Sequence, residues 1–570
     1  MPIVTLNVSQ QVAPLPNTLQ RMGALVSHGG TILSPGTLSY LTQLSDLTPL
    51  LRAAENVTSL TWNTSVVTAT TTVPHGLPIG KNLVLYISGA VPSGYNGVFY
   101  TTITGTSTFT YPLAINPGTE TTPGFWNVND VIEITQMATT WFAQGVSIGA
   151  FVLELGPLND VDAIAALSTY LTNNPNTAYT AGSQGFNYAY LIPRSWDNPV
   201  FAPSAKQALL NLVTQYEAPT AKTYFFITTT LATYQAYTAQ MKSVYAEIES
   251  PQMAAYPQNP LITLAQSGGT VTGSTSVNHG VSPGDWFQLQ GNTPSGYNGW
   301  WQAQQGTAGS VLTWNMPLLS PGAISIPGFL EANQSVNSGV ASNEFSTAAS
   351  MYDVISNNPS SSNKVPPLSY TFQFGVTPWP TQGMSSLFTT LELNSINYIK
   401  TGAEGGISTA SIFLGHTKDG NGFLYWYSVD SVQLYSDENL ANTVINGSNN
   451  RVNPLYYSQD GINRLQDSEY ATIESLASWG LANGTQIVRT SFPASSAPGS
   501  NQMSLTDALD SGNYDGQIVV NAEPYLPYLT ENPGDYRIGK YGGLSVQFIP
   551  SQGFESVVLN LVVTQLITSG

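Results

Sequence analysis

One sequence pattern occurs twice in this chain, and it limits the fold more than any other feature. Residues 73–80 read V-P-H-G-L-P-I-G, and residues 277–284 read V-N-H-G-V-S-P-G. The hexapeptide P-S-G-Y-N-G follows each of them, at 92–97 and at 294–299, and a Pro-Gly pair comes later in both copies. Short Thr- and Val-rich runs broken by Pro and Gly are typical of small all-β units. The sequence therefore predicts two copies of one β module.

The two modules are expected at residues 57–126 and 263–328 and are too few to form a solenoid. Each copy has one His with no carboxylate or second His nearby, so we assign the His to a local turn rather than a metal site. Tyr-Asn-Gly indicates a hairpin turn with a packed Tyr. The expected turn residues are His75, Gly76, Tyr95, Asn96 and Gly97, and in the second copy His279, Gly280, Tyr297, Asn298 and Gly299.

The chain between the copies alternates between apolar strands and amphipathic helices, which predicts a largely parallel sheet covered by helices. Strands are expected at 150–153, 188–192, 224–227 and 244–248, and helices from Asp160 as a cap, from 203 and over 231–242. The pattern resumes after the second copy. Helices are expected at 344–355, 385–393, 429–445 and 466–481, strands at 369–374, 396–399, 412–414, 423–427 and 544–549, and a hairpin turn at 418–422.

The predicted fold class is therefore α/β (α+β) and multidomain, as the length of 570 residues also requires. Its parts are a core sheet with flanking helices, the two inserted modules, and strand-like ends. We divide the chain into an N-terminal strand arm at 1–20, α/β core parts at 21–56, 127–262 and 329–465, the two modules, and a C-terminal domain with a terminal arm at 466–570.

Both ends of the chain read as strands. Val4, Leu6 and Val8 alternate with polar residues near the N-terminus. The same period of two occurs near the C-terminus at Val557, Leu559, Leu561 and Val563. Two interpretations stay open: the two ends pair within one domain, or they are donated as strands to neighbouring subunits.

Composition excludes several partners. The formal charge is −18, from 33 acidic and 15 basic residues, which argues against direct binding to a phosphate backbone. The chain has no Cys, so it has no disulfide or thiolate metal site. We expect no signal peptide and no membrane insertion, because no long uninterrupted apolar run is present.

Candidate catalytic residues are few. No P-loop, zinc-protease or nucleophile-elbow motif is present. Asp160 and Asp162 could form an acid/base pair, but we assign them to the start of a helix, where carboxylates are favoured. Glu247 and Glu249 alternate along a strand and are expected to point to solvent. The sequence predicts no catalytic residue, no metal and no cofactor, and hence a protein that is not an enzyme.

Three stretches, in order, resemble contractile-tail sheath proteins of bacteriophages, in a divergent branch of that family. W-F-A-Q-G at 141–145, before the strand at 149–155, is similar to the family's F-F-x-x-G-G element, although Val146 replaces the second Gly. Asn397-Tyr398 with the stretch 423–430 looks like the central region of the family. The ending from Tyr541 through Ser556 looks like its C-terminal domain.

The resemblance implies a structural subunit of a virion, made in the host cytoplasm. Sheath subunits form stacked six-fold rings around a tail tube protein, with baseplate and tail terminator proteins at the two ends. Their terminal arms exchange strands, and contraction drives the tube through the host envelope for genome ejection. Two alternatives remain: another virion protein whose modules bind a receptor or glycan, and a polysaccharide-acting enzyme.

Overall fold

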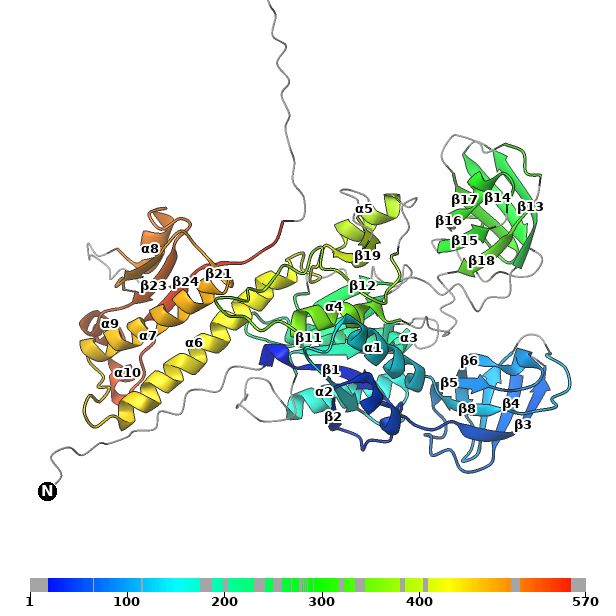
Figure 1. The fold of residues 1–570 in the computed structure, drawn as a ribbon, viewed down its shortest axis with the longest axis horizontal. Helices are drawn as coiled ribbons and strands as arrows, with labels where there is room; N and C mark the ends of the chain where they lie inside the picture. Colours follow the sequence, from blue (N-terminus) through cyan, green and yellow to red (C-terminus); the bar gives the residue numbers. More distant parts are fainter. Residues whose placement is uncertain are drawn as a thin grey trace, which may run out of the picture.

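The computed structural model shows a mixed α/β protein with several sheets (Figure 1). It describes residues 19–554 except for short gaps. The gaps are residues 65, 114–115, 175–186, 198–202, 230–240, 250–258, 268, 276–278, 280, 282, 284–285, 291, 317–321, 326, 334–343, 380–384, 403–408 and 494–502. The expected helix at 231–242 lies almost wholly outside the described residues.

The core is an eight-stranded sheet in the order β2-β9-β1-β10-β11-β12-β19-β20. Its six inner strands are parallel, and the edge strands β2 and β20 run antiparallel to their neighbours. The strands are β1 (Gly23–Ser27), β2 (Thr37–Leu41), β9 (Ala150–Glu154), β10 (Ala189–Ile192), β11 (Tyr224–Thr229), β12 (Val244–Ile248), β19 (Asn397–Thr401) and β20 (Ala410–Phe413). The parallel arrangement predicted from the alternation of strands and helices is confirmed.

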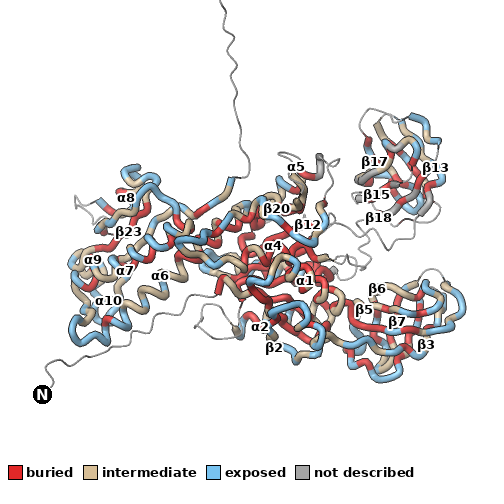
Figure 2. The backbone as a smooth tube through the Cα atoms, in the orientation of Figure 1, coloured by how far each residue is buried: buried red, intermediate tan, exposed pale blue. Residues whose placement is uncertain are grey.

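Helices cover both faces of this sheet, and Figure 2 shows its central strands as buried. Such strands carry apolar residues on both sides. In β11, Tyr224 and Phe226 belong to one buried cluster, and Phe225 and Ile227 belong to the opposite one. The first face is covered by α1 (Asp130–Gln144), α4 (Ser346–Ile355) and the start of α6 (Phe423–Asn449). The second is covered by α2 (Asp160–Asn173), α3 (Pro203–Val213) and α5 (Ser385–Leu393).

Two six-stranded units carry the repeated motif. The first is a closed barrel in the order β3-β4-β7-β6-β5-β8. Its strands are β3 (Glu55–Asn63), β4 (Val66–Thr71), β5 (Asn82–Ser88), β6 (Gly97–Ile103), β7 (Thr108–Pro112) and β8 (Phe125–Val128). The second has the order β16-β15-β18-β13-β14-β17. Its strands are β13 (Asn259–Ser267), β14 (Thr270–Thr275), β15 (Trp286–Gln290), β16 (Gly299–Gln302), β17 (Val311–Asn315) and β18 (Phe329–Asn333). Equivalent strands follow the same cyclic order in both units.

A third body follows the core and contains the rest of the chain. Helix α6 leaves the core and packs against α7 (Gln459–Ser478), which in turn covers a three-stranded sheet. This sheet, in the order β22-β23-β24, consists of β22 (Ile487–Thr490), β23 (Ile518–Ala522) and β24 (Leu544–Gln547). The body also contains α8 (Leu505–Asp510), α9 (Tyr525–Glu531), α10 (Pro533–Ile538), and a two-stranded pair of β21 (Ala482–Asn483) with β25 (Ile549–Pro550).

Residues 423–427, expected to form a strand, are instead the start of helix α6. The aromatic residues favour a strand locally, but Phe423 and Tyr427 are buried against the sheet at helical spacing. The ring centroid of Phe423 lies 4.9 Å from that of Tyr224 and 5.6 Å from that of Phe226. The predicted reverse turn at 418–422 is present, because Thr417 N donates to Asn421 O and His416 forms an antiparallel bridge with Gly422. A helix follows the turn in place of the expected second strand.

The expected strand at 369–374 is also wrong. Tyr370 has a positive φ of 65°, which a regular strand does not allow. The segment instead runs beside β20 and makes single hydrogen bonds to it, from Tyr370 N to Ile412 O and from Gln373 N to Ala410 O. The alternation of aromatic and polar residues in 369–374 therefore belongs to an irregular segment beside the edge of the sheet and not to a strand within it.

Excision of the first barrel is expected to leave the core folded. Glu55 of β3 pairs with Trp126 of β8, so the chain enters and leaves the barrel at neighbouring points. A short Gly-Ser linker in place of 57–126, and a second one in place of 263–328, should therefore close with little strain. Circular dichroism should retain the helical signal of the full chain. Loss of that signal would show that the modules are integral to the core.

Candidate functional site

The densest group of buried ionisable side chains lies where β1 and β10 end, next to the first turns of α1 and α2. The His28 Nε2 atom lies 3.8 Å from Asp130 Oδ1 and 3.6 Å from Asp160 Oδ1, and its Nδ1 atom lies 3.1 Å from Leu158 O. Burial alone would lower the pKa of His28, but the neighbouring carboxylates raise it above its usual value. Ligands of open α/β sheets bind at the carboxyl ends of the strands. This group is therefore the first candidate for a functional site.

Glu154 is the most heavily bonded carboxylate of this edge. It is fully buried at the end of β9. Its Oε1 atom accepts hydrogen bonds from Gly29 N and Gly156 N, both at 2.7 Å, and its Oε2 atom accepts from Thr31 N at 3.1 Å and Thr31 Oγ1 at 2.7 Å. Asp130 holds the same loop, because its Oδ2 atom accepts from His28 N at 2.9 Å. The two carboxylates fix the loop after β1 in place.

Arg194, which follows β10, is engaged within the protein. Its Nη1 atom donates to Gln136 at 2.8 Å, its Nη2 and Nε atoms donate to the carboxylate of Glu249, and its guanidinium lies 4.0 Å from the ring centroid of Phe345. Its backbone N donates to Glu133 at 2.9 Å. With a fourth hydrogen bond from Nη2 to Glu344 O, four of the five N–H donors of this guanidinium are bonded within the protein.

The space enclosed by these residues is too small for a substrate. The cavity lined by His28, Asp130, Glu133, Asp160 and Ser195 has a volume of about 10 Å³, which is room for about one water molecule. The group therefore joins loop, helix and strand ends, and Asp160 also lines a separate, more open pocket of about 270 Å³ together with Lys81 and Asp162. The described residues also contain no group of three or more His, Asp or Glu side chains that could hold a metal ion.

The expected solvent exposure of Glu247 and Glu249 is wrong, because Glu249 has a side chain only 13% exposed that pairs with Arg194, and Glu247 is more deeply buried still. Helix α4 covers this part of β12, so Glu247 is fully buried and accepts hydrogen bonds from Tyr245 OH at 3.0 Å and from Ser350 Oγ. Burial raises the pKa of Glu247 to about 7. Burial likewise raises the pKa of Glu133 to about 7 and that of Asp430 to about 6.

These raised pKa values predict that the protein is more stable at pH 5.5 than at pH 7.5. A carboxyl whose pKa is raised on folding stabilises the fold below its unfolded pKa, and this contribution is lost as the pH rises through the folded pKa. Glu247→Gln, which cannot ionise, should reduce the difference between the two pH values by on the order of 2 kcal/mol. Calorimetric unfolding at both pH values measures this. The exposed Glu474→Gln is the control, and an equal slope in both variants would contradict the assignment.

The remaining acidic pair, Asp160 and Asp162, has one buried and one partly exposed member, and both have structural partners. Helix α2 begins at Asp160, but its cap is the preceding residue, Asn159, whose side chain accepts from Asp162 N at 3.1 Å. Asp162 forms an ion pair with Lys81 of the first barrel at 2.8 Å. The two Asp residues therefore point to different partners and do not form an acid/base pair.

The repeated turn residues have equivalent contacts in the first barrel and in the second six-stranded unit. His75 Nδ1 accepts from Leu77 N at 3.1 Å, and His279 Nδ1 accepts from Val281 N at 2.9 Å. His75 and His279 lie before β5 and β15, and the P-S-G-Y-N-G copies lead directly into β6 and β16. Tyr95 OH donates to Gly118 O at 2.8 Å and Tyr297 OH to Gly322 O at 2.9 Å; Asn96 Oδ1 accepts from Ala90 N and Asn298 Oδ1 from Asn292 N, both at 2.8 Å.

These contacts are all made within each unit, so the motif maintains a loop conformation. Tyr95 and Tyr297 are both buried, at 2% exposure. Gly76 has a positive φ of 69°, and Gly97 begins β6. Gly280 lies outside the described residues, and Gly299 begins β16.

The expected strand arms also lie outside the described residues. These are Val4, Leu6 and Val8 at one end and Val557, Leu559, Leu561 and Val563 at the other. The structure shows where the two segments join the described part of the chain. Gln20 donates from Nε2 to Tyr427 O of α6 at 2.9 Å. At the other end, Ser551 Oγ donates to Gly480 O at 2.6 Å.

The sheet of the C-terminal body has two edges that are open among the described residues. β22 pairs only with β23, in parallel, and β24 pairs only with β23, antiparallel. The described residues place no strand beside the outer side of either. Backbone groups along an open edge can pair with an added strand. This body therefore offers a site for β-strand addition.

No described helix combines the length and the apolar character needed to span a bilayer. No family model matches the sequence, and no curated protein matches it. Among solved structures, the chain is similar to the crystal structure of the sheath tail protein Lin1278 from Listeria innocua, at 8% identity, with 81% of this chain and 86% of that chain covered. The TM-score is 0.32, a value that carries no argument about fold or function.

Proposed function

We propose that this chain is a structural subunit of a contractile phage tail sheath. It polymerises as stacked six-fold rings around the inner tube, and contraction drives the tube through the host envelope. The observation that carries the proposal is the open-edged sheet β22-β23-β24, combined with alternating apolar sequences at both ends of the chain. In strand exchange between subunits, an open sheet edge accepts a strand and a segment of strand-like sequence donates it.

The way the chain enters and leaves its described part supports this proposal. Gln20 contacts α6 through Tyr427 and Ser431, and Gly553 lies against Pro367, whose segment also packs beside α6. The two terminal segments, residues 1–18 and 555–570, are therefore both attached to the described part of the chain near the helix that connects the core to the C-terminal body. Arms that begin at such a joint can link subunits while the bodies of those subunits move.

The composition of the carboxyl edge of the sheet also favours a mechanical role. In an α/β enzyme this edge would hold the substrate, whereas here it is filled by carboxylates and a His that bond to loops and helices. In this proposal the modules at 57–126 and 263–328 are surface insertions, and the partners are the tail tube, baseplate and terminator proteins. Contraction is a change between two packings of rigid bodies, the contracted one being lower in free energy.

The proposal is tested by negative-stain electron microscopy of the purified full chain over a range of concentrations. The expected product is a hollow cylinder with regular transverse striations. Separate monomers at every concentration, or thin filaments without a lumen, would contradict a sheath. In that case glycan-array binding by the full chain would test the alternative role of the two modules.

A further inference from the structure

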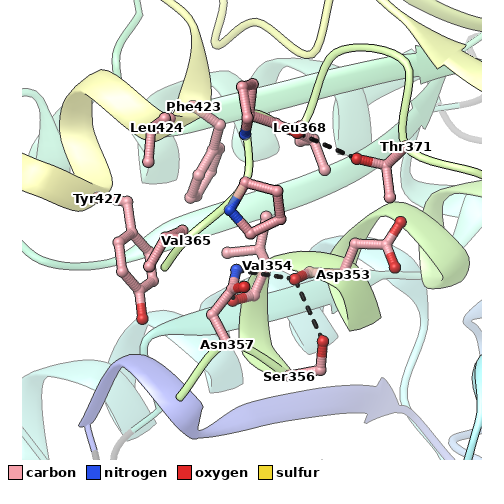
Figure 3. A pocket seen from close by; sticks show the side chains of 12 residues that line it. Asp353, Val354, Ser356, Asn357, Val365, Leu368, Thr371, Phe423, Leu424 and Tyr427 are labelled. Carbon is pink, nitrogen blue, oxygen red and sulfur yellow. Dashed lines mark hydrogen bonds between the residues drawn. The ribbon is translucent and has the colours of Figure 1, made fainter. Parts of the chain in front are cut away.

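A pocket of about 110 Å³ lies between the end of α4, the segment 365–371 and the first turns of α6 (Figure 3). Its walls are largely apolar, and they include Val354, Val365, Leu368, Leu424 and Tyr427. The volume lies between that of one water molecule and the roughly 150 Å³ of a cavity that binds benzene. A pocket of this size fits a branched aliphatic side chain.

The polar groups of this pocket are already bonded to their own surroundings. Asn357 Nδ2 donates to Asp353 O at 3.0 Å, and Ser356 Oγ donates to the same oxygen at 3.3 Å. Thr371 Oγ1 donates to Pro367 O at 3.1 Å, and the carboxylate of Asp353 accepts from Gln373. Because these groups are engaged, the pocket favours an apolar occupant over a polar one.

The C-terminal segment of the chain begins at the wall of this pocket. The pairing of β25 with β21 and the hydrogen bond from Ser551 to Gly480 hold the chain in place just before it reaches the wall. Gly553 then lies so close to the Pro367 ring that an added Cβ would be 2.4 Å from Pro367 Cβ. Phe554, the last described residue, is 86% exposed and leaves the pocket free.

We propose that this pocket binds the first valine pair, Val557–Val558, of the chain's own C-terminal segment. Val557 is four positions beyond Gly553, and an extended chain of four residue steps reaches about 13 Å. The segment 555–570 carries a single charged residue, Glu555, so its chemistry matches an apolar pocket. The root of the C-terminal segment is then held on its own subunit, and the residues beyond Val558 remain available for other contacts.

The absence of Cys from the chain makes disulfide trapping a direct test. Val365→Cys in the pocket is combined with Val557→Cys or Val558→Cys in the full chain, under mild oxidation at low protein concentration. Lys364→Cys is the matched control, because Lys364 neighbours Val365 but is exposed and does not line the pocket. We expect one of the two valine positions to form an intrachain disulfide several-fold faster with position 365 than with position 364.

Two results would overturn the proposal. An undocked segment would react at least as fast with the exposed Cys at 364, and a segment held elsewhere would react with neither position. A disulfide-linked dimer as the main product, on mixing the single variants Val365→Cys and Val557→Cys, would identify a second copy as the occupant. Thr371→Cys, on the same pocket wall, replaces Val365→Cys if that variant lowers the thermal stability.

An independent measurement uses the reactivity of one thiol. In the single variant Val365→Cys, deletion of 555–570 should raise the rate of labelling by a thiol reagent by about tenfold, because the pocket loses its occupant. An unchanged rate would contradict docking. Both measurements are made on the monomer, so docking can fail while tube formation succeeds, and the reverse also holds.

Discussion

Deletion of residues 555–570 is expected to give a folded, monomeric protein that forms no tubes. The last paired strand of the described residues, β25, ends at Pro550, so the deletion removes no described sheet pairing. In the proposed assembly these residues supply a strand to a neighbour, and a polymer without that strand loses its main-chain hydrogen bonds. Circular dichroism and size-exclusion chromatography should show a folded monomer, and negative-stain images should show no cylinders.

Point substitutions on the two faces of this segment give a sharper form of the same test. Leu559→Asp and Leu561→Asp place charges on its apolar face and should abolish tubes, because burial of an unpaired charge opposes strand addition. Asn560→Asp adds the same charge on the other face and should leave tube formation largely intact. Tubes formed by the truncated protein would refute strand donation by this end.

Glu154→Ala is expected to cost about 3–5 kcal/mol of core stability, because it leaves several buried donors without an acceptor. The backbone N–H groups of Gly29, Thr31 and Gly156 all donate to this carboxylate, which is fully buried. Loss of this shared acceptor should open the loop after β1. Urea unfolding followed by Trp fluorescence measures the loss.

Two variants control for the Glu154 result. Glu154→Gln keeps the shape and one acceptor oxygen, so it should lose less stability than Glu154→Ala. Glu474→Ala removes an exposed carboxylate from α7 and should change stability by less than about 0.5 kcal/mol. Equal stability of Glu154→Ala and the wild type would show that water replaces the carboxylate without cost.

The central strands of the core could be predicted because their apolar runs need no distant information. β10, β11 and β12 are buried on both faces, and such strands appear in sequence as short continuous apolar stretches. The start of α6 was misassigned because its aromatic residues favour strands, and the helix depends on packing of Phe423 against β11. That contact joins residues about 200 positions apart in the sequence, so it cannot be predicted from a local sequence pattern.

The buried carboxylates were missed for a similar reason. In the sequence, the whole first barrel separates His28 from Asp130, and the whole second unit separates Glu247 from helix α4, which covers it. One sequence pattern was nevertheless present: His28 follows β1 directly, and Glu154 ends β9. Polar residues at the carboxyl ends of apolar strands meet at one edge of a parallel sheet, and this pattern indicated a cluster there.

Helix α6 joins the core sheet to the C-terminal body, and buried residues of all three belong to one continuous apolar cluster. At its base, the carboxylate of Asp430 accepts hydrogen bonds from Tyr188 OH at 2.9 Å and Tyr224 OH at 2.8 Å, and its far half carries the C-terminal body. A helix of 27 residues is about 40 Å long. The 19 residue steps from Asp430 to Asn449 span about 29 Å, so a tilt of about 10° at the tyrosine pivot would move the far end of the helix through roughly 5 Å. Small rearrangements beneath the sheet are thereby amplified at the opposite end of the molecule.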